Sequence, residues 1–224
     1  LWLTRYICKK TMDIFIYLFV ALFSVLNPIG TVPIFVGLTQ GYTSSERSKT
    51  SLVTSINVFI ILMISFFVGQ YVLSFFGITI TALRIAGGII IASSGFSLLN
   101  GNFSKNKGIN KKVQKEAEAR QHIALTPLAM PMLAGPGSIS LLIAYFQELS
   151  ESGDVITTTE ILFSCLAILA VAALIYIVLR SAHYLAKILG SSGIVAISRI
   201  IGFLTIAIGI QYIISATLSI IRGI

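Results

Sequence analysis

The most informative segment of this sequence is residues 13–38, which read DIFIYLFVALFSVLNPIGTVPIFVGL. At about 1.5 Å per residue, a helix of this length crosses a hydrocarbon layer of about 30 Å. One tetrapeptide, Asn27-Pro28-Ile29-Gly30, interrupts the apolar run. Proline removes a backbone donor and glycine loosens the backbone, so we expect a membrane-spanning helix that breaks near its middle.

The rest of the chain is equally apolar. Of its 224 residues, 56% are hydrophobic and 11% are charged, and the mean hydropathy is +0.94. A soluble domain needs more charge to cover its surface. Further apolar intervals long enough to span a bilayer are residues 52–76, 78–99, 122–146, 161–179 and 194–221. We expect helices there, because backbone groups inside lipid must be paired within their own segment.

Two of these intervals contain an arginine, which is rare inside a membrane helix. The segments Arg84-Ile85-Ala86-Gly87 and Arg199-Ile200-Ile201-Gly202 lie 115 residues apart, and Pro136 follows Pro28 at a distance of 108. Three spans per copy is an odd number, so the second copy must enter from the opposite side. We therefore predict an all-α integral membrane protein of six transmembrane helices, arranged as two inverted three-helix repeats with broken first helices. The alternative is chance similarity between Ile/Ala/Gly-rich helices.

These intervals also predict the organisation of the chain. Residues 13–100 form the first half and residues 122–224 the second, joined at 101–121 by a basic loop that we place in the cytoplasm. Residues 1–12 are expected to be an N-terminal extension, because Met12-Asp13 looks like a natural start. No signal peptide is expected, since no small-residue cleavage site follows a short apolar core.

The second proline lies in Gly135-Pro136-Gly137-Ser138, so both halves carry a break. The half-helices after the breaks begin near mid-membrane and point their partially positive ends at the same region. Free amides at a helix start bind anions such as a carboxylate. We predict a central site for a small zwitterionic solute; the alternative is two proline kinks that only help helices to pack. The predicted site consists of Asn27, Pro28, Gly30, Thr31, Gly135, Pro136, Gly137 and Ser138.

Arg84 and Arg199 complete this predicted site in matched supporting roles. An arginine inside a span usually faces the bundle interior, and we expect no Asp or Glu at mid-membrane to pair with either one. The expected partners are carbonyls of the broken helices or the carboxylate of the substrate. The alternative is snorkelling toward the membrane surface.

Several other functions are disfavoured by the residues present. The net charge of +8 does not indicate a nucleic-acid partner, because the Lys and Arg residues lie in short segments between the apolar intervals. No Asp, Glu or His is expected deep in a span, which argues against proton coupling, a metal or another cofactor. Neither His122 nor His183 lies at the depth of Ser138, so we expect no enzyme of the serine-protease type. The expected partners are a small zwitterionic substrate and the lipid bilayer, with a homo-oligomer left open.

The motifs LNPIGTVPIF at 26–35, RIAGG at 84–88 and AGPGSI at 134–139 resemble the MarC family. The resemblance covers nearly all of residues 12–222. It implies a six-span protein of the bacterial inner membrane, similar in plan to the LysE exporter superfamily, that transports small neutral amino acids such as glycine and alanine. The alternatives are an exporter of another small solute and a non-transporting membrane scaffold or sensor.

The distribution of basic residues predicts the orientation of the chain. The termini and the loops after the second and fourth intervals hold four Lys and Arg residues, whereas the opposite loops hold ten. The positive-inside rule then places both termini outside. A membrane-impermeant thiol reagent should label an Asn110→Cys variant, freed of its natural cysteines, only after the cells are permeabilised. Labelling of intact cells would reverse the predicted topology.

Overall fold

A computed structural model describes residues 2–39, 42–100, 128–129, 133–151 and 158–221. All the regular elements assigned in these ranges are helices, which confirms the all-α class. They are α1 (Trp2–Leu26), α2 (Pro28–Leu38), α3 (Ser44–Phe76), α4 (Ile80–Leu99), α7 (Pro136–Glu151), α8 (Thr158–Arg180) and α9 (Ala182–Ile221). The predicted extension at 1–12 therefore continues into α1 without a break at Met12.

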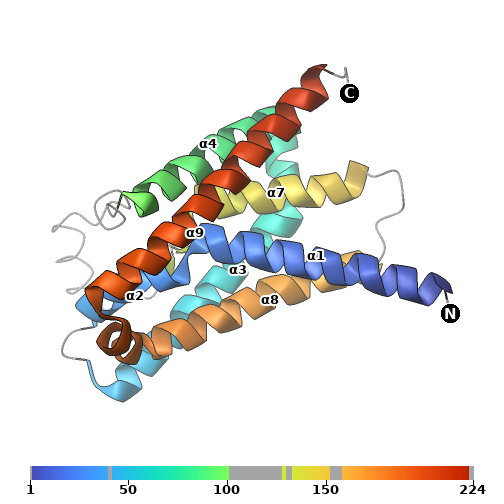
Figure 1. The fold of residues 1–224 in the computed structure, drawn as a ribbon. Coiled ribbons are helices and arrows are strands. Elements are labelled where there is room, and N and C mark those ends of the chain that lie inside the picture. Colours follow the sequence, from blue (N-terminus) through green and yellow to red (C-terminus); the bar gives the residue numbers. More distant parts are fainter. Residues whose placement is uncertain (1, 40–41, 101–127, 130–132, 152–157, 222–224) are drawn as a thin grey trace.

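The helices form one elongated bundle, shown in Figure 1. Both chain ends lie at one end of this bundle, and α2 ends, α3 begins and α8 ends at the other (Figure 1). The half-helices α2 and α7 start near the middle and leave it in opposite directions. This placement of the two half-helices agrees with the predicted directions of the two breaks.

Several helices have the length and composition of membrane spans. In the described ranges, 4 helices qualify: α3, α4, α8 and the part of α9 from Ser192 to Ile221. Met12–Leu26 and Pro28–Leu38, bent by 40°, together make a fifth candidate span. The predicted interval 122–146 lies partly outside the described residues, and its last part belongs to α7. The chain is a multi-pass membrane protein.

Capping groups, rather than hydropathy, decide where helices begin. α3 starts at Ser44 instead of residue 52, because the Thr43 N–H donates to Glu46 Oε2 at 2.7 Å and the Glu46 N–H donates to Thr43 Oγ1 at 3.3 Å. This reciprocal capping box satisfies two donors that would otherwise lack partners. α3 ends at Gly77, whose φ of 64° lies in the left-handed region that glycine adopts without strain.

The α4–α9 pair is held together by glycines. A Cβ atom added to Gly88 would lie 2.6 Å from the carbonyl oxygen of Gly209, and one added to Gly95 would lie 2.7 Å from that of Gly202. Because Gly88 contacts Gly209 and Gly95 contacts Gly202, α4 and α9 pack in antiparallel directions. The contact is also reciprocal, as it is between two copies related by a two-fold axis.

The glycines in this contact are spaced differently along the chain from the two arginines. Gly202 lies 114 residues after Gly88, and Gly209 lies 114 after Gly95, whereas Arg84 and Arg199 lie 115 apart. A shift of one residue turns a helix by about 100°. Positions paired at a distance of 115 therefore do not share a face, although the two sequences look alike.

The remaining contacts also join helices from the two halves of the chain. α2 packs against α9 and α8, while α7 packs against α4 and α3. Each half-helix that follows a break thus lies on the last helix of the other half of the chain. α3 and α8, the middle helices of the two halves, also pack against each other.

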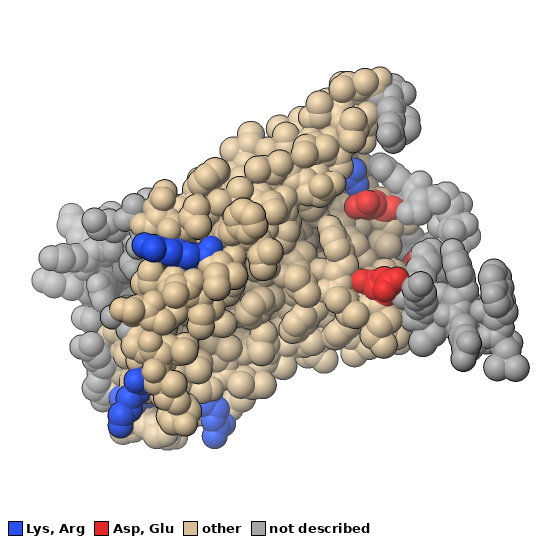
Figure 2. Space-filling model, viewed as in Figure 1, with Lys and Arg blue, Asp and Glu red and all other residues tan. Residues whose placement is uncertain are grey.

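The outside of the bundle is apolar. Phe75, Ile200 and Phe203 expose 85%, 66% and 65% of their surface. Figure 2 shows a broad band without charge between basic side chains toward one end of the bundle and acidic ones at the other. An uncharged band of this kind suits lipid and would be costly in water.

The glycine contact makes a prediction about stability. Gly95→Ala should lower the free energy of unfolding by about 1–3 kcal/mol, because its Cβ would meet the backbone of α9 at 2.7 Å. Gly37→Ala is the control, since nothing lies within 4 Å of a Cβ there and alanine favours a helix by up to about 1 kcal/mol. Melting temperatures of the two variants in detergent test this, and equal values would refute a close α4–α9 contact.

Candidate functional site

The first break is built around Asn27. Its backbone has φ 43° and ψ 66°, and it is the one non-glycine residue with positive φ in the described part of the chain. Asparagine tolerates this left-handed conformation better than most residues. Its Oδ1 accepts a hydrogen bond from the Gly30 N–H at 3.2 Å, and its carbonyl accepts one from Thr31 Oγ1 at 3.3 Å. Asn27 therefore ends α1 and caps α2.

The rest of the Asn27 amide is left unpaired. Asn27 and Thr31 are fully buried, and Asn27 Nδ2 has no hydrogen-bond partner among the described residues. A Cβ atom on Gly30 would lie 2.2 Å from this nitrogen, so glycine is needed beside it. A buried donor without an acceptor costs about 1–3 kcal/mol, which marks Asn27 as a position that a ligand or water would complete.

Pro28 also leaves the carbonyl of Ser24, four residues earlier, without its helical donor. The Thr205 hydroxyl of α9 lies 2.9 Å from this oxygen and 2.8 Å from the Ile201 carbonyl oxygen. Its single proton is shared between the two acceptors. The sequence analysis missed Thr205, because a threonine in an apolar helix ordinarily bonds only to its own preceding turn.

The second break begins α7 with the same arrangement. Pro136 is its first residue, and the Gly135 carbonyl accepts from the Ser138 N–H at 3.1 Å, the Ile139 N–H at 3.2 Å and Ser138 Oγ at 2.9 Å. Ser138 is buried and uses its hydroxyl on its own turn, whereas Pro136 is exposed and Gly135 partly exposed. The predicted polar role of Ser138 is thus capping in this structure.

The two breaks lie close together in space. A Cβ atom on Gly137 would lie 3.5 Å from Val25 Cγ1, at the end of α1, and 3.1 Å from Ile91 Cγ1 of α4. In each break proline has no N–H and the third residue of the helix is capped. Ile29 and Gly137 follow these prolines in the first turns of α2 and α7, where a helix offers its N–H groups no acceptor of its own.

Arg84 does not reach the breaks, and its partner corrects our expectation. Its Nη2 lies 3.5 Å from Glu148 Oε2, on the last turn of α7, so an acid is available after all. The arginine side chain is 15% exposed. Arg199 is exposed, while its neighbour Ser198 is buried. The two arginines therefore lie in different environments.

Two further titratable groups are relevant to the prediction about proton coupling. Glu160 lies in the first turn of α8 and is buried. His183 lies at the start of α9, away from both breaks; partial burial lowers its pKa, and the nearby charge of Arg47 lowers it further. His122 lies outside the described residues. No group of His, Cys and acidic side chains able to hold a metal occurs among the residues described.

The Thr205 contact leads to a second stability prediction. Thr205→Val keeps the shape of the side chain but leaves the buried Ser24 carbonyl without a donor, which should cost about 1–3 kcal/mol. Thr205→Ser should retain most of the stability. Thr217→Val is the control on the same helix, because that hydroxyl is exposed and bonds only to Ile213 O. Equal melting temperatures for the two valine variants would show that the contact contributes nothing.

Comparison with known proteins gives consistent results. Residues 12–221 match the family described as MarC family integral membrane protein. A UPF0056 membrane protein of Buchnera aphidicola (subsp. Schizaphis graminum) is 40% identical over 201 residues, covering 90% of each chain. The UPF0056 inner membrane protein MarC of Escherichia coli (strain ATCC 8739) is 39% identical over 209 residues, covering 91% of this chain and 93% of that protein. No solved structure matches. With this identity across nearly its whole length, the chain belongs to the MarC family of integral membrane proteins.

Proposed function

We propose that the chain is a secondary transporter of small neutral amino acids such as glycine and alanine, and not an enzyme. The observation that carries the proposal is the buried and unpartnered Nδ2 of Asn27 at the junction of two half-helices. The first-turn N–H groups of Ile29 and Gly137 are two further candidate donors. Three donors at positively polarised helix starts suit a carboxylate. A scaffold that binds no ligand does not need such donors.

The proposed architecture is the six-span inverted repeat. Its first support is the antiparallel, reciprocal contact of α4 with α9 through glycines 114 residues apart. Its second support is the packing of α2 on α9, which matches that of α7 on α4. In transporters of this plan the substrate lies where the two halves meet, near the bilayer midplane. We place the proposed substrate site at the two breaks, because α2 after the first break packs on α9 and α7 after the second packs on α4.

The proposed orientation puts both termini outside a bacterial inner membrane and the basic loop at 101–121 inside. The support is the excess of Lys and Arg in loops on one side of the predicted spans. The printed name of the E. coli relative, an inner membrane protein, agrees with this location. Glycine and alanine fit the proposal because each carries a carboxylate that helix-start donors can bind, and because the resemblance to the MarC family implies such substrates.

Asn27→Asp tests the site without removing the cap. The aspartate retains an oxygen for the Gly30 N–H but replaces the Nδ2 donor by an acceptor. Loss of a hydrogen bond to a charged group weakens binding about tenfold or more, and the new charge would repel a carboxylate. Purified variant in liposomes should therefore take up glycine and alanine at least about tenfold more slowly than the parent chain at low substrate concentration.

Asn57→Asp is the matched control, since it makes the same substitution in the middle of α3. It should transport at close to the parent rate once both variants are shown to be folded by size-exclusion chromatography. Parent-like transport by Asn27→Asp would remove the breaks from the substrate site. A folded parent chain that moves neither glycine nor alanine would overturn the proposed function itself.

A further inference from the structure

A short helical segment at residues 182–189 is set apart from the rest of α9. Gly190, with φ 60° and ψ 178°, interrupts the helix between this segment and the candidate span that starts at Ser192. Figure 1 shows these first turns at an angle to the rest of α9, at the end of the bundle where α3 begins and α8 ends. Neither the predicted site nor the proposed function uses this segment.

The segment has one apolar side toward the protein and a mixed side away from it. Leu185 and Leu189 pack against the core. Tyr184 lies three residues before Lys187 and four before Ile188, so these three side chains share the other side. Lys187 is exposed, and Tyr184 and Ile188 expose 67% and 60% of their surface. Tyrosine, lysine and isoleucine together on an exposed helix side are typical of a helix that lies at the level of the lipid headgroups.

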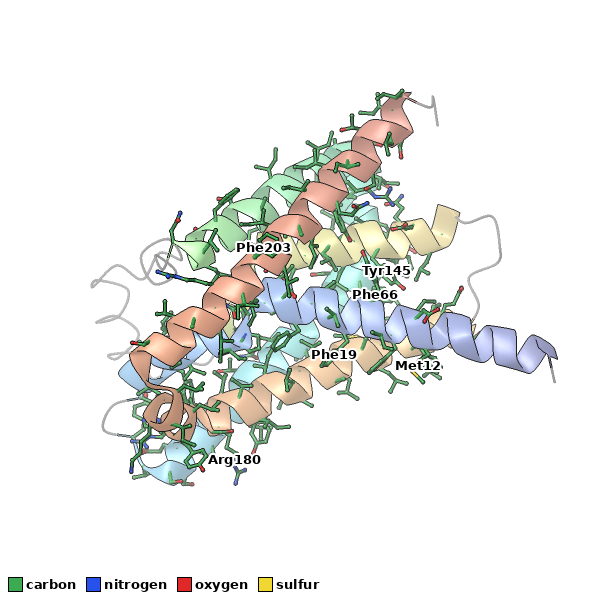
Figure 3. All side chains as sticks on the ribbon, in the orientation of Figure 1. Met12, Phe19, Phe66, Tyr145, Arg180 and Phe203 are labelled. Atoms are coloured by element: carbon green, nitrogen blue, oxygen red, sulfur yellow. The ribbon has the colours of Figure 1, made fainter. Side chains whose placement is uncertain are left out.

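Basic side chains from three helices meet at this segment. Partial burial lowers the pKa of His183 in α9, and the nearby charge of Arg47 in α3 lowers it further, so the two side chains lie close together. The next residue of α3, Ser48, lies beside the Tyr176 hydroxyl of α8, and this hydroxyl accepts a hydrogen bond from Arg180 Nη1. Figure 3 labels Arg180 at the end of α8, and Figure 2 shows basic side chains there. We call the place where residues 182–189 meet Arg47 and Arg180 the basic corner.

The described acids do not balance the charge of the basic corner. Lys49 and Lys187 add to its two arginines, whereas the described acid at this end, Glu46, already accepts hydrogen bonds from Thr43. The Arg47 side chain is partly buried, and its Nε has no hydrogen-bond partner among the described residues. A buried charged donor without an acceptor is costly, so an anion bound here would stabilise the corner.

We propose that the basic corner binds the phosphate of an anionic phospholipid in the adjoining leaflet. Arg47 and Arg180 contact the phosphate oxygens, because a guanidinium group offers paired donors that match them. Tyr184 and Ile188 lie against the acyl chains and hold the corner at headgroup depth. Phosphatidylcholine has the same phosphate but also a quaternary ammonium group, which the neighbouring cations repel. A soluble phosphate would make no use of the exposed apolar side chains.

Fluorescence quenching by brominated lipids tests this proposal. The chain holds one tryptophan, so Trp2→Phe combined with Ile188→Trp leaves a single reporter on the exposed side of residues 182–189. In vesicles that mix phosphatidylcholine with brominated phosphatidylglycerol, quenching measures the preference for one lipid over the other. Phosphatidylglycerol should be preferred by at least about fivefold, the effect of one basic side chain near an anionic surface. Phe75→Trp in the same background, 85% exposed at the other end of α3, should show no such preference.

Arg47→Gln and Arg180→Gln should each lower the preference at residue 188 about fivefold. Arg199→Gln is the matched control, because it removes the same charge from an exposed position of α9 outside the basic corner. It should change the preference by less than about twofold, since salt screens distant charges. Equal losses in Arg199→Gln and Arg47→Gln would show diffuse attraction in place of a site and overturn the proposal. Equal preferences at residues 188 and 75 would overturn it as well.

Inorganic phosphate, added at constant ionic strength, should leave the quenching unchanged. Displacement of the lipid by phosphate would assign the corner to a soluble anion and overturn the proposal. Native mass spectrometry of the chain with natural residues gives a second measurement if the variants do not fold: phosphatidylglycerol should stay bound longer than phosphatidylcholine, and equal retention overturns the proposal. No readout measures transport, so the lipid site can fail while the proposed function holds, and the reverse.

Discussion

Inside a bilayer, a backbone carbonyl that loses its helical donor finds no water, and another part of the protein must supply a proton. Pro28 creates this need at Ser24, and Thr205 of α9 meets it. α9 is in turn held against α4 by glycines, and Ile91 of α4 packs on Gly137 at the start of α7. The distance between the two breaks therefore depends on a chain of contacts that begins with one hydroxyl and one carbonyl.

Asn27 combines features that a purely structural kink does not need. Its backbone lies in the left-handed region, its Oδ1 caps α2, and its Nδ2 is buried without an acceptor. A glycine there would adopt the same backbone angles with less strain and carry no buried amide nitrogen, although the Gly30 N–H would lose its cap. The unpaired Nδ2 lowers the stability of the folded chain. We interpret this loss of stability as the cost of keeping a donor available for a ligand. Asn27 at the first break is fully buried, whereas Pro136 at the second break is exposed.

Electrostatics divides the molecule along its length. Basic side chains lie toward the end where α2 ends and α3 begins, and acidic ones lie at the end near the termini (Figure 2). Arg84 is the exception, and its contact with Glu148 ties α4 to the last turn of α7. The arginine that looked like part of a midplane site thus belongs to the acidic end of the protein.

The sequence by itself determined the all-helical class, the membrane setting and both breaks, because hydropathy and proline act within a single segment. The interval 13–38 can be recognised as a broken span from its own residues, without knowing which other helices it contacts. Only the tertiary structure decided which faces meet: the glycines pair at a distance of 114 although the arginines repeat at 115, and Glu148 comes to Arg84 because α7 continues to Glu151. The role of Thr205 could not be predicted from the sequence for the same reason. Its hydroxyl bonds to a carbonyl 181 residues away, and the residues around Thr205 do not indicate this partner. The choice of partner depends on how the helices pack.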